Sequence, residues 1–242
     1  MVNDQHHSPR NHLLASLLPA DLALLKGHLW PVQLALMKEM ERPNRRIESV
    51  YYMERGIASV VAVRSDAIRV EIGLIGREGM SGTAVVLGTD QSPHSTYIEV
   101  PGDGQRIAAN DLRMAMNTSA SLRNSLLKFV QVFVVQTGET AIANARAHIE
   151  ERLARWILRA HDRLDDDNLP LSHEFLALML GVRRAGVTEA LQRLKRKRLI
   201  GTRRNHIVVL DREKIERVAG EFYGSSEQEY RRLIGPALRT VS

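Results

Sequence analysis

The sequence predicts an α+β protein in three successive parts: an antiparallel β-roll (a double-stranded β-helix), a long helix, and a C-terminal winged helix-turn-helix. Three observations support this prediction. Short β-branched segments separated by glycines fill residues 49–107, a helical period runs from residue 111 to 163, and two short helix patterns with a hairpin follow residue 172. Short strands with glycine turns are typical of antiparallel rolls and sandwiches. We therefore expect the β-roll at residues 1–115, the long helix at 116–150 and the winged helix-turn-helix at 151–242.

The composition is that of an ordinary globular protein, and it excludes several kinds of site. Of the 242 residues, 44% are hydrophobic and 26% are charged. There is no cysteine, which excludes disulfides, thiolate zinc sites and cysteine-bound iron–sulfur clusters. Apolar runs such as 132–135 are too short to span a bilayer, and the polar start, Met1–Arg10, lacks the apolar segment of a signal peptide. We expect a cytoplasmic protein without a membrane partner.

Two short helices are expected before the roll, over residues 13–18 and 21–25, with Pro19 between them. Residues 57–63, 96–100 and 105–108 are expected to be strands of the roll. Apolar and polar residues alternate in a further strand, whose apolar face is Ile68, Val70, Ile72 and Leu74. That period of two predicts a half-buried strand with Glu71 on its other face.

The long helix carries two neighbouring apolar stripes. The first stripe is Leu122, Leu126, Phe129 and Phe133, and the second is Leu127, Val130, Val134 and Thr137. Two stripes predict a helix that is buried on two sides. One side can pack on the roll and the other on the same helix of a second subunit, so we expect a homodimer. We assign dimerisation to the first stripe; the alternative is a helix buried wholly within its own chain.

The C-terminal part begins after a polar turn at 165–170. Ser172 can cap a short helix, and Gly181 suits the end of that helix. A second helix over 184–197 has Val187, Leu191 and Leu194 as its buried stripe, and 199–210 forms a hairpin with a basic tip. Two short helices with a tight turn, followed by a hairpin, predict a winged helix-turn-helix.

The positive charge is concentrated in this last part. Residues 183–204 hold nine arginines and lysines against one carboxylate, Glu189, so this segment carries +8 while the whole chain carries +6. Such a local excess is typical of a surface that binds a polyanion. The alternative reading of a charge run taken alone is a solvated helix face.

Side chains near the start of the second helix suit the edges of base pairs, because arginine donates two hydrogen bonds to guanine and glutamate accepts one from cytosine. We expect base reading by Arg183, Arg184, Ala185, Thr188 and Glu189. Contacts to phosphate give affinity without sequence information. We expect them from His173, Arg193, Lys195, Arg203, Arg204 and Asn205.

Residues 173–200, HEFLALMLGVRRAGVTEALQRLKRKRLI, resemble the DNA-binding domain of the Crp/Fnr superfamily of bacterial transcription regulators. Residues 75–82, IGREGMSG, resemble the glycine-rich turn of that family's cyclic-nucleotide-binding-like roll, and the resemblance covers about residues 11–224. It implies a roll that senses a signal, a long helix that dimerises, and a winged helix that reads palindromic double-stranded DNA. RNA polymerase is then a candidate partner.

The effector positions implied by this resemblance are Gly82, Thr83, His94 and Ser95. Threonine and histidine stand where cyclic-nucleotide-binding members have glutamate and arginine. A neutral histidine is a poorer phosphate partner than arginine, which is always charged. We therefore expect an unknown small effector or none, and no response to cyclic AMP.

The sequence is also compatible with two other classes of function to different degrees. An enzyme is not expected, because no catalytic triad, carboxylate pair, metal-ligand set or phosphate-binding loop is visible in the sequence. A regulatory or scaffold protein that binds a small ligand or a protein partner through the roll is the alternative. The basic segment 183–198 favours DNA over such a partner.

Overall fold

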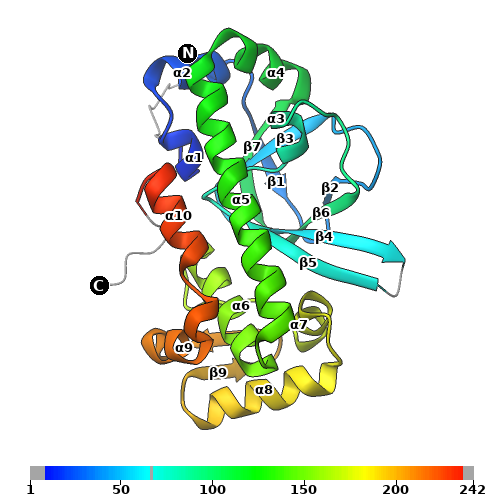
Figure 1. Ribbon diagram of the computed structural model, residues 1–242, viewed down its shortest axis with the longest axis vertical. Coiled ribbons are helices and arrows are strands. Elements are labelled where there is room, and N and C mark those ends of the chain that lie inside the picture. Colours follow the sequence, from blue (N-terminus) through cyan, green and yellow to red (C-terminus); the bar gives the residue numbers. More distant parts are fainter. Residues whose placement is uncertain (1–8, 66–67, 237–242) are drawn as a thin grey trace.

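The computed structural model describes residues 9–65 and 68–236 and confirms the α+β fold class (Figure 1). Two short helices, α1 (His12–Ala15) and α2 (Pro19–Lys26), precede the roll. Asn11 caps α1, because its Oδ1 accepts a hydrogen bond from the Leu14 N–H at 2.9 Å. Its Nδ2 donates to the carbonyl oxygens of Met53 and Gly79. The start of the described chain is thereby attached to the roll.

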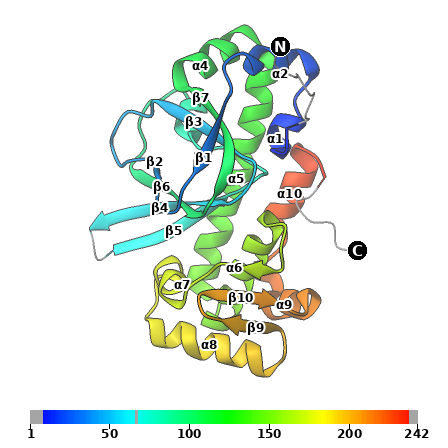
Figure 2. The same cartoon turned by 180° about the vertical axis from the view of Figure 1, so that it is seen from behind.

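The roll consists of two antiparallel sheets that face each other (Figure 2). The four-stranded sheet has the order β2 (Glu39–Glu41), β6 (His94–Val100), β4 (Ile57–Ser65) and β5 (Ile68–Ile75). The three-stranded sheet has the order β1 (Trp30–Leu34), β7 (Gly102–Ala108) and β3 (Ser49–Met53). A short helix, α3 (Thr83–Val86), lies between β5 and β6 in the sequence. Apolar side chains from both sheets, including Leu34 and Ile98, fill the interior.

The predicted helical segment is divided into three helices, α4 (Ala109–Thr118), α5 (Ala120–Arg146) and α6 (Ile149–Arg163). Ser119 begins α5, since its Oγ accepts from the Leu122 N–H at 3.1 Å. The Glu151 carboxylate accepts from the His148 N–H at 2.6 Å, which caps α6. Helix α5 runs from the roll to the C-terminal part of the molecule (Figure 1).

The stripe that we assigned to dimerisation packs within its own chain. Leu122, Leu126 and Phe129 are at most 3% exposed and lie in a core with the N-terminal helices and β3. Phe133 is half-buried against the roll, and its ring lies so close to Gly73 that a Cβ there would be 2.6 Å away. That assignment was therefore wrong, because a helical period does not reveal which of two apolar faces meets the same chain. In the second stripe, Leu127 and Val134 are exposed.

Among the described residues, helix α5 is long and apolar enough to cross a bilayer by length and composition alone, because its apolar residues are spread over 27 residues rather than gathered in one run. Core helices of soluble proteins have the same properties, and one face of α5 is packed on the roll.

A buried network of charged and polar groups joins α6 to the roll. Trp156 Nε1 donates to the Glu71 carboxylate at 2.8 Å, and the Arg159 guanidinium lies 3.4 Å from the same carboxylate. Arg163 Nε donates to Glu78 Oε1 at 2.7 Å. Glu71 is 2% exposed, although the alternation in β5 predicted a solvent-facing position. The prediction failed because α5 and α6, from a distant part of the chain, cover that face of β5.

The C-terminal part contains the two predicted helices, α7 (His173–Leu180) and α8 (Arg184–Arg196). A three-stranded sheet has the order β8 (Asn168–Leu169), β10 (His206–Val209) and β9 (Ile200–Arg203). The segment at 165–170, expected to be a solvated turn, therefore supplies a strand to the wing. Asp165 in the same segment forms an ion pair with Arg10 at 2.8 Å.

The described chain ends with α9 (Arg212–Ala219), a short 3₁₀ helix (Gly220–Phe222) and α10 (Ser225–Leu233). Helix α10 runs back along α5 towards α1 (Figures 1 and 2). Tyr230, which is 3% exposed, donates from its hydroxyl to the Glu78 carbonyl oxygen at 3.1 Å. Ile234 packs against the cluster that contains α1. The C-terminal part is thus attached to the roll by α6 and by α10.

Candidate nucleic-acid interface

Helices α7 and α8 form the helix-turn-helix from the signals that predicted it. Ser172 Oγ accepts from the Phe175 N–H at 3.1 Å and caps α7. Gly181 ends α7 with φ +60°, in the left-handed region that glycine adopts without steric cost. The predicted stripe of α8, Val187, Leu191 and Leu194, is at most 1% exposed. Burial of this stripe fixes which face of α8 points outward.

Most of the predicted base-reading residues lie on the outward face of α8. Arg183, Arg184, Ala185 and Glu189 are exposed. Thr188 is half-buried, and its hydroxyl donates to the Arg184 carbonyl oxygen at 3.1 Å. Helix α8 lies at the end of the molecule opposite α4, with its outer side turned away from the roll (Figure 1). Three long polar side chains are therefore exposed at the start of this helix, Arg183 at its N-cap and Arg184 and Glu189 in its first two turns.

His173 links the two helices of the motif. Its Nδ1 lies 3.2 Å from the Thr188 hydroxyl oxygen. Burial lowers the pKa of His173, and the positive charge of Arg184 lowers it further. A neutral His173 is then favoured near neutral pH, which suits a hydrogen-bonding role better than a charged contact to phosphate.

The wing places three of the predicted phosphate-binding residues at its tip. Strands β9 and β10 pair from His206–Arg203 to Val209–Ile200, and the turn between them is Arg204–Asn205. Asn205 has φ +56°, a conformation that asparagine tolerates in tight turns. Arg203, Arg204 and Asn205 are exposed.

Arg193 and Lys195 at the end of α8 differ in their surroundings. Arg193 Nε lies 3.1 Å from Glu150 Oε2, and Lys197 Nζ lies 2.6 Å from the other oxygen of the same carboxylate. Lys195 is exposed. Glu150 belongs to the first turn of α6, so it was not visible in the sequence as a partner of this basic segment. The positive charge of Arg193 is partly neutralised by it.

The four residues of the predicted effector site lie in the roll, on separate elements. Gly82 and Thr83 begin α3, and His94 and Ser95 begin β6. The Gly82 N–H donates to the Glu41 carboxylate at 2.7 Å, so a side chain of this chain already occupies that donor. Ser95 is buried, and burial lowers the pKa of His94. The effector role of these residues stays a prediction.

The comparison with protein families identifies residues 151–218 as a Crp-like helix-turn-helix domain. The search of curated proteins finds no match. Many solved structures have the same fold. FixK2 from Bradyrhizobium japonicum is 16% identical, with a TM-score of 0.68 over 79% of this chain and 98% of that one. A putative regulator of the Crp/Fnr family from Eubacterium rectale is 18% identical, with a TM-score of 0.66 over 86% of this chain and 97% of that one.

A third structure, of a CRP-family transcriptional regulator from Thermus thermophilus, is 17% identical with a TM-score of 0.65, over 78% of this chain and 97% of that one. These findings confirm the resemblance to the Crp/Fnr superfamily and the order of roll, long helix and winged helix-turn-helix. Each of the three is matched over nearly its whole length.

Proposed function

The chain has the fold and the Crp-like helix-turn-helix domain of the Crp/Fnr regulators, and on that premise we propose that it is a DNA-binding transcription regulator that acts as a homodimer on a palindromic site. The observation that carries the proposal is the exposure of Arg183, Arg184 and Glu189 on a helix whose opposite face is fully buried. In this proposal residues 1–115 form the regulatory roll, 116–150 the dimerisation helix and 151–242 the DNA-binding part.

In the proposed complex, α8 enters the major groove. Arg183 and Arg184 donate to guanine, Glu189 accepts from cytosine, and Thr188 and Ala185 contact neighbouring base edges. Phosphates are bound by Lys195 and by the wing residues Arg203, Arg204 and Asn205, which give affinity at every sequence. Arg193 binds phosphate only by leaving Glu150, and His173 acts by orienting Thr188.

The proposed dimer contact is the exposed face of α5 rather than the buried stripe. Leu127 and Val134 are 38% and 58% exposed. The face repeats at spacings of three and four residues, the period of a two-stranded coiled coil. Its members are Asn124, Leu127, Gln131, Val134, Gly138, Ala141 and Ala145. The small residues of its second half let two backbones approach closely.

A charge in the middle of this face tests the dimer. Val134→Glu is expected to give a monomer in size-exclusion chromatography with light scattering, because two carboxylates would be buried against each other. Met114→Glu is the matched control: Met114 is also 58% exposed, but it lies on α4. A dimer that persists in Val134→Glu would contradict the α5 contact.

The DNA-binding proposal is tested by selecting bound fragments from a genomic library with the purified protein. We expect an inverted repeat whose half-sites lie about 34–36 Å apart, one helical turn. Affinity should fall steeply with salt, because phosphate contacts release counterions. Cyclic AMP should leave the affinity unchanged, since Thr83 and His94 replace the residues that bind it in relatives. Selection without any enriched repeat would contradict sequence-specific regulation and leave the scaffold function.

A further inference from the structure

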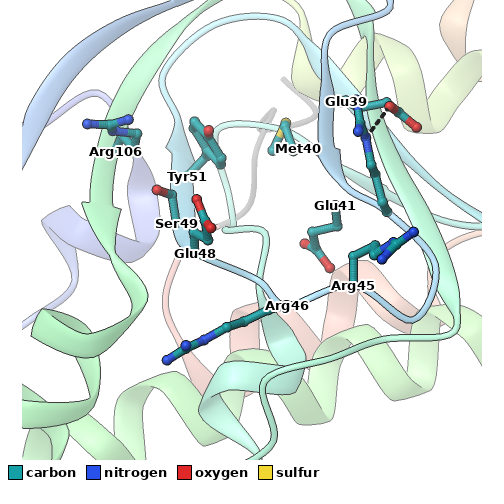
Figure 3. Close-up of a pocket in the computed structure, with 10 residues that line it drawn as sticks. Glu39, Met40, Glu41, Arg45, Arg46, Glu48, Ser49, Tyr51 and Arg106 are labelled. Carbon is teal, nitrogen blue, oxygen red and sulfur yellow. Dashed lines mark hydrogen bonds and ion pairs between the residues drawn. The ribbon is translucent and has the colours of Figure 1, made fainter.

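Arginines line a wide cavity in the roll and a small cavity at α6, and the two differ in their exposure. The wide cavity, of about 670 Å³, lies between β2, β3 and β7, and its arginines are exposed and do not converge on one point (Figure 3). The small one, the α6 cavity, lies where β5, α5, α6 and α7 meet. Its lining includes Arg152, Arg155 and Arg159 together with Glu71 and Thr140. The α6 cavity is the stronger candidate for a specific site, because its arginines are buried or half-buried.

Helix α6 brings the three arginines to one face. Their positions are three and four residues apart, the spacing at which side chains of a helix are neighbours. Arg155 and Arg159 are 5% and 1% exposed, and Arg152 is half-buried. Burial lowers the pKa of Arg159, and the nearby positive charge of Arg155 lowers it further. Glu71 supplies the negative charge of the described lining, one against three positive charges, so the lining has a surplus of two.

Two of the three guanidinium groups have a buried Nε without a hydrogen-bond partner among the described residues, namely those of Arg152 and Arg159. Arg159 shares the Glu71 carboxylate, which lies 3.4 Å from it, with Trp156, whose Nε1 donates to the same carboxylate at 2.8 Å. Arg152 donates to Asn144 Oδ1 at 2.7 Å, which is a neutral acceptor. A buried donor without an acceptor is costly, so the two Nε–H groups point to an acceptor that this chain does not supply.

Arg155 has the least compensated charge of the three. Within residues 9–65 and 68–236 its guanidinium donates to the Thr140 hydroxyl oxygen at 3.2 Å and forms no ion pair. Burial lowers its pKa, and three carboxylates, Glu227 the strongest of them, reduce this effect without pairing with it. Arg163 on the same helix is as deeply buried but lies 2.7 Å from Glu78. Burial opposes its charge as well, but Glu78 and other carboxylates outweigh burial and raise the pKa of Arg163. What Arg155 lacks is an anion of its own.

The size of the α6 cavity decides which ligand fits. The centre of a water-sized sphere has about 10 Å³ there, so the cavity has room for about one such sphere. That volume excludes phosphate, sulfate and organic anions. One water molecule fits, but a neutral molecule leaves the surplus charge buried without an anion, which is costly. A monatomic anion satisfies both the size and the charge, and the exposed Asn144 in the lining gives it access from solvent.

We propose that the α6 cavity binds one chloride ion. The guanidinium group of Arg155 and the Nε–H groups of Arg152 and Arg159 donate to it. The ion neutralises one of the two surplus charges. Because its ligands and the rest of the lining come from β5, α5, α6 and α7, the ion stabilises the contact between the roll and the winged domain. The site does not depend on the DNA-binding proposal.

Thermal unfolding of the full chain in sodium chloride and in sodium gluconate, at equal ionic strength, tests the site. Gluconate is too large for the cavity, so the comparison separates binding from screening by salt. An ion bound with a Kd on the order of 10 mM should raise Tm by about 3–6 °C at about 150 mM chloride, because it binds the folded chain alone. Equal Tm values in the two salts overturn the proposal.

A variant assigns the shift to the cavity. Arg155→Met removes the least compensated guanidinium, so its Tm should be the same in chloride and in gluconate. Arg123→Met is the matched control: it removes an arginine from an exposed position on α5 outside the cavity lining, and it should keep the full chloride shift. A chloride shift that persists in Arg155→Met, or that both variants lose, would mean a general salt effect and would overturn the proposal.

Diffraction from the parent protein tests the site even where Arg155→Met does not fold. Crystals grown in sodium bromide should show an anomalous peak in the α6 cavity, within hydrogen-bond reach of the Arg155 guanidinium. Peaks on the surface alone overturn the proposal. Arg184→Ala changes the DNA surface only and should keep the chloride shift, so the chloride proposal and the regulator proposal fail separately.

Discussion

Helices α6 and α8 both carry several arginines, and their environments are opposite. In α6, Arg155, Arg159 and Arg163 are at most 5% exposed. In α8, Arg184 and Arg196 are exposed. The difference lies in what faces each helix: the roll presents Glu71 and Glu78 to α6, whereas the outer side of α8 meets solvent. A basic helix is therefore a candidate DNA-binding surface only where its own chain offers few carboxylates to it.

The buried arginines of α6 also specify how the two halves of the molecule meet. A charge removed from water is tolerated only when it is paired and its remaining hydrogen bonds are made. Burial lowers the pKa of Arg159 to about 9, so it remains charged at neutral pH beside Glu71. Sliding α6 along β5 would separate these groups. The interface is thus specified by polar geometry and by its apolar contacts together.

The largest expected effect comes from removing the carboxylate that pairs with Arg159. Glu71→Leu should lower the free energy of unfolding by about 3–5 kcal/mol, because it leaves a buried guanidinium unpaired. Urea denaturation followed by circular dichroism measures this change. Glu189→Leu, an exposed position on α8, should change stability by less than about 0.5 kcal/mol. Similar values for the two variants would remove the contrast between α6 and α8.

A smaller effect is expected when an arginine of α8 is removed, and it should appear in binding rather than in folding. Arg184→Ala should cost about 1–3 kcal/mol at the selected DNA site and relax the base preference there. Fluorescence anisotropy with matched and mutated sites measures both. The control is Arg217→Ala, which removes the same charge from an exposed position on α9. Equal losses of DNA affinity in both variants would mean that α8 binds DNA only as a non-specific basic surface.

Glu99, a carboxylate near Glu71, has no arginine partner within residues 9–65 and 68–236, and it sharpens the comparison further. Burial, and then the charge of Glu71, raise the pKa of Glu99 from 4.5 to about 8. The folded chain therefore holds a proton there that the unfolded chain has already lost, so stability falls as pH rises from about 4.5 to 8. Glu99→Gln should flatten this part of the melting-temperature profile, measured by differential scanning fluorimetry. Parallel profiles of melting temperature against pH for Glu99→Gln and the parent protein would contradict the raised pKa of Glu99.

The hydrophobic period predicted which side chains are buried where the helix packs on elements close to it in the sequence. In α8, Val187, Leu191 and Leu194 were expected to be buried and are. The same reasoning failed at Glu71, where distant segments decide the burial of a face. At Leu122 it predicted burial correctly but not that the packing partner is the same chain. The basic residues of α8 were found from charge alone, but the partner of Arg193 was not, because Glu150 lies 43 positions away.

The return of α10 to α5 has a mechanical consequence. A body hinged to its neighbour at one point can swing in any direction, whereas a body hinged at two points can turn only about the line that joins them. The winged domain is tied to the rest of the chain at the α5–α6 junction and where Tyr230 reaches the Glu78 carbonyl oxygen, and Trp156 and Arg159 of α6 add a third attachment at Glu71. Any rotation of α8 about the line through the first two ties therefore requires the contacts of α6 to Glu71 to break.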